Sequence, residues 1–323
     1  MRSRATSRDP KKREAVRLVR CGCAMTAPRQ VLPGTTWLVT RRCSERRRFL
    51  TPSAIVNEIF LFVLGVAARR YDLEVHAFCV MSNHYHLLVT DPAARLPAFV
   101  QYLNAFVARA VNASLGRWEG FWASNTTFSG VSNATPMDVV RKVAYVLANP
   151  VAAGLVQDGR EWPGLRTAPE QLGTAVLTAR RPAKFFRAKG SMPASVELAL
   201  TAPPGFACAQ EFRDAVAREV HRLEEQARRA FAGKGRRFLG RAKVLSQDPL
   251  TSPTTMEPRR TLNPRIAALD PVERIDAIAR LKRFAREYRV ALAMLRAGTR
   301  DVVFPAGTYR LRVELDVRCA AAG

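Results

Sequence analysis

The chain has few of the features that mark membrane, secreted or disulfide-stabilised proteins. It contains no run of about 18 apolar residues, the length that a helix needs to cross a bilayer. Its basic beginning has no apolar segment of the kind found in secretory signal peptides. The six cysteines lie at irregular spacings, and Cys21-Gly22-Cys23 has no second pair with which to bind a metal. We therefore expect a cytoplasmic protein without a disulfide framework and without contact to a membrane.

Acidic residues are also scarce. The sequence has 52 Lys and Arg against 27 Asp and Glu, which gives a net charge of +25, while its hydrophobic fraction of 48% is that of a globular protein. Residues 1–50 hold 14 basic and 3 acidic residues, residues 51–156 hold 7 and 6, and residues 157–323 hold 31 and 18. The electrostatic field of this positive charge favours an acidic polymer as partner, usually nucleic acid. The alternative is that the basic excess only reflects the arginine-rich proteins of a genome with high GC content.

The composition and length divide the chain into three expected parts. Residues 1–33 are basic and without periodicity, so we expect a disordered arm, within which Met25 is an alternative start. Residues 34–165 carry the alternating and helical patterns of a compact domain. Residues 166–323 are basic and mainly helical in pattern, and they suit a DNA-binding appendage about as well as an oligomerisation module.

The apolar spacing predicts strand, helix, strand, strand, helix, strand and helix in that order. The expected positions are 35–42, 51–70, 73–81, 84–89, around 99–107, within 118–130, and 135–149. Thr51-Pro52 predicts an N-cap followed by proline in the first turn. Thr135 with Asp138 predicts a capping box, and Pro150 predicts that the last helix ends near Asn149.

The C-terminal part shows two long helical patterns and little else that is regular. Residues 209–232 form one amphipathic helix, and a second begins at Asp270. Between the domain and these helices, residues 157–200 are expected to be irregular. Within them, residues 180–187 alternate basic and aromatic side chains, a pattern that can hold phosphates while stacking bases.

Histidine is rare in this sequence, and two of its four histidines are neighbours on one predicted strand. His84 and His86 are two positions apart, so both imidazoles project from the same face of the strand. The pair then faces one metal ion or one phosphate together. A pair of solvated structural histidines is the alternative interpretation. Downstream, Tyr145 and Asn149 are four apart on a predicted helix and therefore share a face.

These two stretches resemble the single-tyrosine HUH transposases, most closely the REP-associated tyrosine transposases. The matching pieces are Met81-Ser82-Asn83-His84-Tyr85-His86 and Tyr145-x-x-x-Asn149-Pro150-Val151-x-x-Gly154. The resemblance covers about residues 35–165. It implies an α/β, or α+β, ferredoxin-like HUH endonuclease domain, in which helices pack on an antiparallel sheet and a mainly helical basic extension follows.

The resemblance also implies a chemistry for four residues. In the family two histidines and a polar residue after the tyrosine hold a divalent metal, which carries over to His84, His86 and Asn149 with Mg²⁺ or Mn²⁺. The tyrosine, here Tyr145, attacks DNA and leaves a 5′-phosphotyrosine and a free 3′-OH. The expected partner is single-stranded or hairpin DNA at repeat ends, near the bacterial nucleoid. In relatives the tyrosine helix serves the active site of its own subunit or that of a partner subunit. A homodimer is therefore one possible assembly of this protein.

Four basic residues near these motifs are candidate phosphate contacts. Arg41 and Arg42 leave the first strand, while Arg141 and Lys142 precede Tyr145 by one turn. A solvated basic face is the alternative for each of them. For the site itself, zinc is the other metal that suits imidazole, but no cysteine is placed to complete a tetrahedron. The other functions considered are a non-catalytic hairpin-binding regulator and a replication-initiator-like nickase.

Overall fold

The structure is a computed structural model that describes residues 28–123, 129–133, 135–187, 189–255, 265–299 and 301–321. Most of the predicted basic arm, with Cys21, Cys23 and Met25, lies outside these residues. No helix within the described ranges combines the length and apolarity that a bilayer crossing requires.

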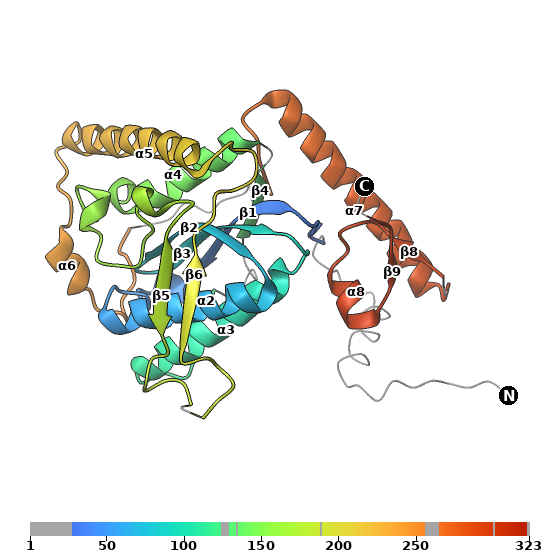
Figure 1. Ribbon diagram of the computed structural model, residues 1–323, viewed down its shortest axis with the longest axis horizontal. Coiled ribbons are helices and arrows are strands. Elements are labelled where there is room, and N and C mark those ends of the chain that lie inside the picture. The colour runs from blue at the N-terminus through green and yellow to red at the C-terminus, as the bar shows by residue number, and fades with distance from the viewer. Residues whose placement is uncertain are drawn as a thin grey trace.

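A five-stranded sheet forms the centre of the molecule (Figure 1). Its strand order is β2-β3-β1-β4-β7, and β7 is parallel to β4 whereas the other neighbours are antiparallel. The strands are β1 (Thr35–Arg42), β2 (Glu74–Met81), β3 (His84–Asp91), β4 (Ser129–Asn133) and β7 (Ile266–Ala267). The predicted order of elements, the turn between β2 and β3 and the α/β class with an antiparallel sheet and packed helices are confirmed.

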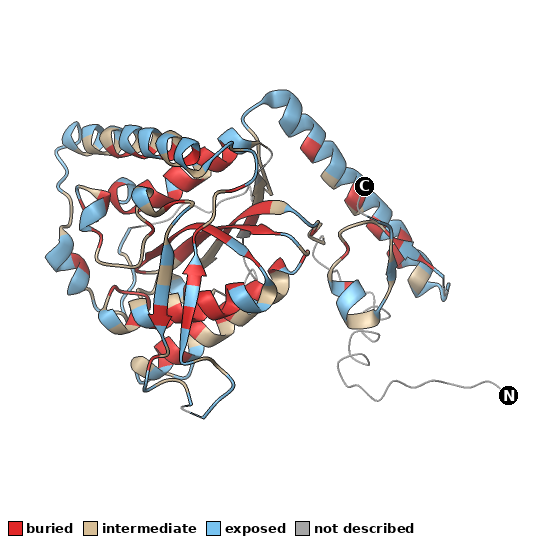
Figure 2. Cartoon of the chain, in the orientation of Figure 1, coloured by how far each residue is buried: buried red, intermediate tan, exposed pale blue. Residues whose placement is uncertain are grey.

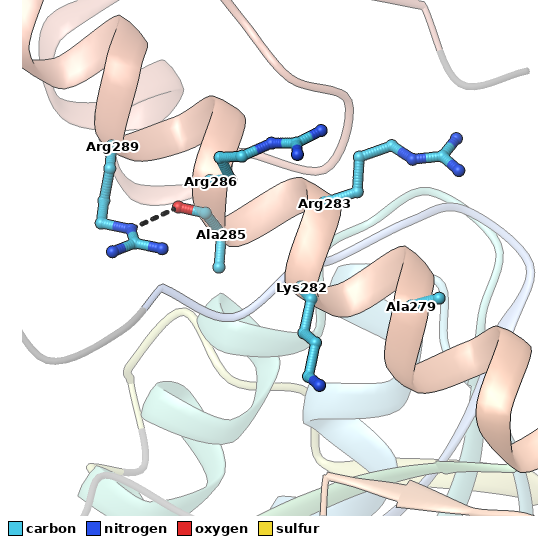
Figure 3. Close-up of a pocket in the computed structure, with 6 residues that line it drawn as sticks. All are labelled: Ala279, Lys282, Arg283, Ala285, Arg286 and Arg289. Carbon is cyan, nitrogen blue, oxygen red and sulfur yellow. Dashed lines mark hydrogen bonds between the residues drawn. The ribbon is translucent and has the colours of Figure 1, made fainter.

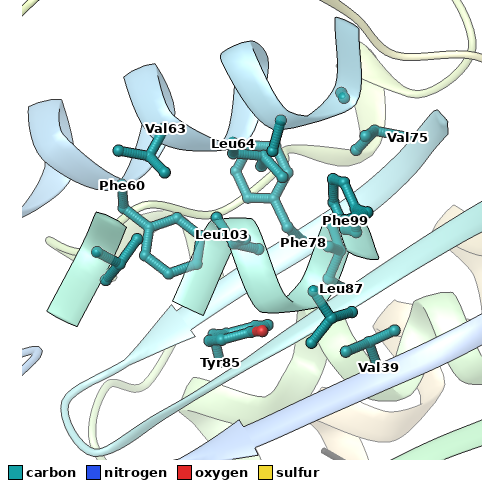
Figure 4. Packing of buried hydrophobic residues seen from close by; sticks show 14 of the residues in the cluster. Val39, Phe60, Val63, Leu64, Val75, Phe78, Tyr85, Leu87, Phe99 and Leu103 are labelled. Carbon is teal, nitrogen blue, oxygen red and sulfur yellow. The ribbon is translucent and has the colours of Figure 1, made fainter. Parts of the chain in front are cut away.

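One face of the sheet packs against two helices, α2 (Ala54–Tyr71) and α3 (Leu96–Ser114). Because strand side chains alternate between faces, Val39, Tyr85 and Leu87 all point into this layer. The Tyr85 ring meets Phe60 of α2 edge-on, with ring centroids 5.2 Å apart (Figure 4). Tyr85 and Leu87 are fully buried, as expected for core residues that face away from the histidines.

The opposite face carries α4 (Pro136–Ala152), and α5 (Ala209–Ala232) lies along α4 on its outer side (Figure 1). Leu38 and Leu88 from the sheet share a second core with the apolar stripe of α4. The predicted stripe of α4 is buried in full: Val139, Val143, Val146 and Leu147. Burial therefore concentrates on the sheet and on the helix sides that face it (Figure 2).

Two predicted helix boundaries are wrong and one is confirmed. The N-cap of α2 is Ser53, whose hydroxyl accepts from the Val56 amide, whereas the Thr51 hydroxyl donates to the Arg48 carbonyl. Thr135 and Asp138 form the predicted capping box of α4. Helix α4 continues through Pro150 to Ala152. A proline in the last turn costs the helix one backbone hydrogen bond. Burial of Pro150 and Val151 in the core offsets this cost.

Residues 157–200 are more regular than expected. They contain a hairpin, β5 (Val176–Arg180) and β6 (Ser195–Ala199), that packs on α2. Val196 and Leu198 alternate with exposed residues and point into the core, a two-residue period that the sequence interpretation missed. The ring centroid of Phe186 lies 5.3 Å from that of Phe62 on α2, and the partly buried Phe186 packs against the core.

The last part of the chain holds α7 (Pro271–Arg296), which begins at the predicted cap Asp270 and extends away from the sheet (Figure 1). Its C-terminal half forms a third small core with the segment around Phe304. The remaining elements are η1 (Ser44–Arg46), η2 (Gly159–Glu161), η3 (Pro169–Gln171), α6 (Arg241–Leu245), β8 (Val303–Phe304), α8 (Arg310–Leu315) and β9 (Arg318–Cys319). The division of the chain near residue 165 stays a prediction.

Candidate active site

Strand β3 brings the two imidazoles together on the face of the sheet that α4 covers. The Nε2 atoms of His84 and His86 are 3.1 Å apart, and the rings are nearly perpendicular, with centroids 4.7 Å apart. His86 is buried, whereas His84 is partly accessible. Two ring nitrogens therefore converge on one point at the edge of the core.

A hydrogen bond on the far nitrogen orients each imidazole. His84 Nδ1 lies 2.7 Å from the side-chain oxygen of Asn83, whose own amide donates to the Arg46 carbonyl. An amide oxygen only accepts, so His84 carries a proton on Nδ1 and its Nε2 faces His86. His86 Nδ1 lies 2.8 Å from the hydroxyl of Thr40 on β1. Such contacts on the second nitrogen are typical of metal-binding histidines.

Helix α4 supplies a third polar group at the same point. The Asn149 amide nitrogen is 3.2 Å from His86 Nε2, and the side chain is 9% exposed. Exchanging the amide nitrogen and oxygen, which have nearly the same shape, places an oxygen there instead. The helix is held in this position by its capping box and by its buried stripe, which includes Val143 and Leu147.

Tyr145 lies one turn before Asn149 and borders the histidine pair. Its ring centroid is 5.4 Å from that of His86, at an interplanar angle of 71°. Unlike the imidazole beside it, the residue is 46% exposed. The phenol is thus open to a large substrate and stands next to His86 of its own chain.

The electrostatic surroundings keep His86 neutral. Burial first, then the charges of His84 and Arg42, hold the pKa of His86 well below its usual range. A neutral imidazole has a free lone pair, which is the form that binds a metal. The polar groups of the site are therefore arranged to donate electron pairs to a cation.

The donor set suits a divalent cation bound by two nitrogens and an amide oxygen. The distance from a histidine nitrogen to a bound zinc ion is about 2.0–2.1 Å. Two such nitrogens at a right angle around one ion lie about 3 Å apart. The two Nε2 atoms have nearly this separation, 3.1 Å. Among the residues described, no three His, Cys, Asp or Glu side chains come together as a metal-binding group. Cys79 pairs with His86 in the ladder between β2 and β3, and burial raises the pKa of its thiol to about 12.

The four basic residues predicted near the site have different positions. Arg42 pairs with His84 in the ladder between β1 and β3, and its charge acts on His86. Arg41 alternates to the other face, where its guanidinium lies 5.9 Å from the Trp122 ring centre. The structure thus brings Arg42 to the histidines and directs Arg41 away from them.

Arg141 and Lys142 lie on α4 one turn before Tyr145, as predicted. Arg141 is exposed and Lys142 is partly buried. The charge of Arg141 extends toward α5, where Arg222 mainly, and Arg141 to a lesser degree, lower the pKa of Glu219. Of this pair, Arg141 is the more accessible to a ligand on the surface beside Tyr145.

Sequence reasoning missed the residues that support the site. The Thr40 hydroxyl is hydrogen-bonded to His86. This contact could have been predicted only from the register of β1 against β3, which pairs Thr40 with His86. Arg166 donates to the carbonyl of Leu147 on α4 and also pairs with Glu224 of α5, with 3.8 Å between charged atoms. No sequence pattern connects these three distant positions.

Comparisons with known proteins place this geometry in context. Residues 38–147 match the family described as IS200-like transposases. A solved REP-associated tyrosine transposase bound to a REP hairpin is 19% identical, with a TM-score of 0.38, covering 46% of this chain and 84% of its own. A candidate transposase from Deinococcus radiodurans R1 is 21% identical, with a TM-score of 0.26, covering 33% and 85%. No curated protein sequence matched the chain.

Proposed function

We propose that the protein cuts and rejoins single-stranded DNA through a 5′-phosphotyrosine on Tyr145. The match of residues 38–147 to the IS200-like transposases supports this proposal. The observation that carries the proposal is the juxtaposition of an exposed phenol with a pair of oriented imidazoles. The Tyr145 ring lies 5.4 Å from that of His86, and Asn149 closes the same site from the next turn of α4. The match to the transposase family also supports a DNA-processing enzyme.

His84, His86 and Asn149 are the residues that would hold the divalent metal, Mg²⁺ or Mn²⁺. When bound, the ion would polarise the scissile phosphate and stabilise the negative charge that develops on its oxygens. Thr40 and Asn83 would keep the two imidazoles in their tautomers and orientations. Arg42, on the same face, is placed to bind a neighbouring phosphate oxygen.

Tyr145 supplies the nucleophile. Its hydroxyl loses a proton to solvent, which its exposure allows, and its oxygen forms a bond to phosphorus while the bond to the 3′ oxygen breaks. The products are a 5′-phosphotyrosine and a 3′-OH. Because the ester keeps the energy of the phosphodiester, a second 3′-OH reverses the step and joins strands without ATP.

We propose that the substrate is single-stranded DNA that folds into a hairpin at repeat ends. The net charge of +25, concentrated on both sides of the nearly neutral segment 51–156, supports a polyanionic partner. Tyr145 and His86 approach within one chain, so a single subunit can assemble the site. This arrangement does not depend on a homodimer.

A labelled hairpin oligonucleotide incubated with protein and Mn²⁺ tests the proposal. The wild type should form a covalent adduct that survives denaturing electrophoresis, and Tyr145→Phe should lose it while still shifting the free DNA in a native gel. Tyr71→Phe serves as the matched control and should keep the adduct, since it removes a phenol hydroxyl from α2, on the other face of the sheet. Binding without an adduct in the wild type would instead identify a hairpin-binding regulator.

A further inference from the structure

Helix α7 carries an exposed basic face at some distance from the histidine site. Four exposed cationic side chains project from the same side of the helix within two turns: Lys282, Arg283, Arg286 and Arg289. Figure 3 shows them as two pairs, with Arg283 and Arg286 directed to one side and Lys282 and Arg289 to the other. We call these four residues the basic face. They lie outside residues 38–147, so the family match does not account for them.

Acidic residues do not neutralise the basic face. Residues 281–296 hold 5 basic residues and a single acidic one, Glu287. None of the four cations forms an ion pair within the part of the chain that the structure describes. Arg289 donates to the carbonyl of Ala285 one turn earlier, a contact that leaves its charge in place. Neighbouring like charges on a helix repel one another, and a polyanion would relieve that repulsion.

Helix α5 shows the opposite arrangement of charge. It holds 5 Lys and Arg and 5 Asp and Glu. Three of its arginines form ion pairs with glutamates about one turn away: Arg222 with Glu219, Arg228 with Glu224 and Arg229 with Glu225. Helix α5 thus neutralises most of its own surface, as expected for a solvated helix. The unpaired charges of α7 are therefore not a general feature of the long helices in this chain.

The opposite side of α7 holds the basic face in a fixed position. Asp270 caps the first turn of the helix. Phe284 and Tyr288 are 2% and 4% exposed and belong to the third core, where the Tyr288 ring lies 5.6 Å from that of Phe304. A ligand of the basic face can therefore bind to a helix that is already formed.

We propose that the basic face of α7 binds the phosphates of double-stranded DNA, the form that a hairpin stem takes. The choice of DNA as the polymer rests on the proposed function. Lys282 and Arg289 are roughly 10 Å apart along the helix axis. Over that length a DNA duplex presents about six phosphates, whereas one strand presents about three.

The side chains of α7 also favour a paired partner over an unpaired one. Single-stranded nucleic acid is usually held by aromatic rings on which its bases stack. The two aromatic residues of α7, Phe284 and Tyr288, are buried on the other side of the helix. The basic face thus offers charge and hydrogen-bond donors to a phosphate backbone, a kind of contact that carries no base sequence information.

A second copy of this chain fits the basic face less well. In a symmetric dimer the same patch of each subunit meets its copy. Four cations would then face four cations, and such like-charge contacts are unfavourable. Charge complementarity therefore assigns the basic face to a polyanion.

The first test compares two double variants that remove the same charge. Arg283→Gln with Arg286→Gln should weaken binding of a fully paired DNA duplex about tenfold. It should also reduce the slope of log K against log salt by about 1.8, the value for two phosphate contacts. Arg69→Gln with Arg109→Gln changes exposed residues of α2 and α3 and should alter the affinity about twofold or less. Equal losses in the two variants would overturn the proposal.

The second test replaces the duplex by an oligothymidine of the same length, which cannot pair. Here Arg283→Gln with Arg286→Gln should weaken binding about threefold or less, because the lower charge density of a single strand engages fewer of the cations. The same fold loss for both ligands would contradict the assignment to paired DNA. Thermal unfolding should show that the variant is as stable as the wild type, since both side chains are exposed.

Sedimentation of the protein without DNA tests the dimer. The wild type and the variant Arg283→Gln with Arg286→Gln should have the same mass. If the variant instead changed the mass and kept the duplex affinity, the basic face would join copies of the chain, and the proposal would be wrong.

Duplex binding and DNA cleavage are measured separately. Binding is measured without metal and can be repeated in Tyr145→Phe, so it requires no covalent step. If the wild type forms no adduct while the two double variants differ about tenfold, the nuclease assignment fails and the duplex site stands. If the adduct forms and the two double variants bind duplex equally, the reverse holds.

Discussion

The sheet domain and the region that follows it use polar residues in different ways. Residues 51–156 hold 7 basic and 6 acidic residues, and the site within them consists of two imidazoles, an amide and a phenol. Residues 157–323 hold 31 basic and 18 acidic residues. One region offers electron pairs to a cation, and the other offers positive charge to an anion.

The two regions are nevertheless joined at particular contacts. Arg166 and Glu224 form an ion pair with side chains only 7% and 10% exposed, and Arg166 also donates to Leu147 of α4 at 2.8 Å. Nearer the start of β2, His76 lies 2.9 Å from the Thr201 carbonyl. The later region thus supports the helix that carries Tyr145, in addition to supplying basic surface.

The largest expected effect on DNA cleavage comes from a comparison of two histidine-to-alanine variants, one in each region. His84→Ala removes one of the three donors, so cleavage at fixed Mn²⁺ should fall about 1000-fold, equivalent to about 4 kcal/mol. His221→Ala on α5 changes an exposed histidine and should leave cleavage unaltered. Single-turnover cleavage of the hairpin measures both. Similar activity of the two variants would break the contrast between the regions.

The buried ion pair is the next test. Arg166→Met leaves Glu224 with Arg228, which is partly exposed, as its remaining ion-pair partner among the described residues, so the free energy of unfolding should fall by about 3 kcal/mol in urea titrations. Arg160→Met, which breaks an exposed pair with Asp158, should have little effect. If Arg166→Met proved as stable as wild type, α5 would not depend on this contact.

The third test uses pH at the junction of β2 with Thr201. Burial lowers the pKa of His76 from 6.5 to about 4, although its contact with the Thr201 carbonyl opposes this. The unfolded chain therefore binds this proton first, and stability is lost as the pH falls from about 6.5 to 4, by up to about 3 kcal/mol. His76→Gln should lose this part of the pH dependence. Urea unfolding of the wild type and of His76→Gln at pH 7 and pH 4 measures the prediction. If the difference in free energy of unfolding between the two proteins is the same at both pH values, the prediction is wrong.

The smallest effect concerns the support of His86. Thr40→Val removes the hydroxyl bonded to Nδ1, so the affinity for Mn²⁺ should fall about 10- to 100-fold. Thr36→Val makes the same change on the same face of β1, where the hydroxyl lies 2.7 Å from Thr90 instead. Calorimetric titration with Mn²⁺ distinguishes them, and equal affinities would remove Thr40 from the site.

Much of the fold near the site could be predicted from local patterns. The strand 35–42, the helix 209–232 and the capping box at Thr135 follow from alternation, apolar spacing and cap residues. The hairpin of β5 and β6 was missed because its strands are short and half exposed. The continuation of α4 past Pro150 depended on tertiary burial, which overrides local preference.

The site shows the same limit. The two-residue period places His84 beside His86, and the four-residue period places Tyr145 beside Asn149. Neither period can say that Arg42 faces the histidines while Arg41 lies against Trp122. That distinction requires the register of β1 against β3.

The sequence by itself determined the order of strands and helices in the domain and the four residues that it offers for chemistry, because both depend on periodicities within a single element. Only the tertiary structure decided that Thr40 orients His86 and that Arg166 holds α4 to α5. Those contacts join residues far apart in the chain, and their geometry depends on strand register and helix packing, which local spacing does not encode.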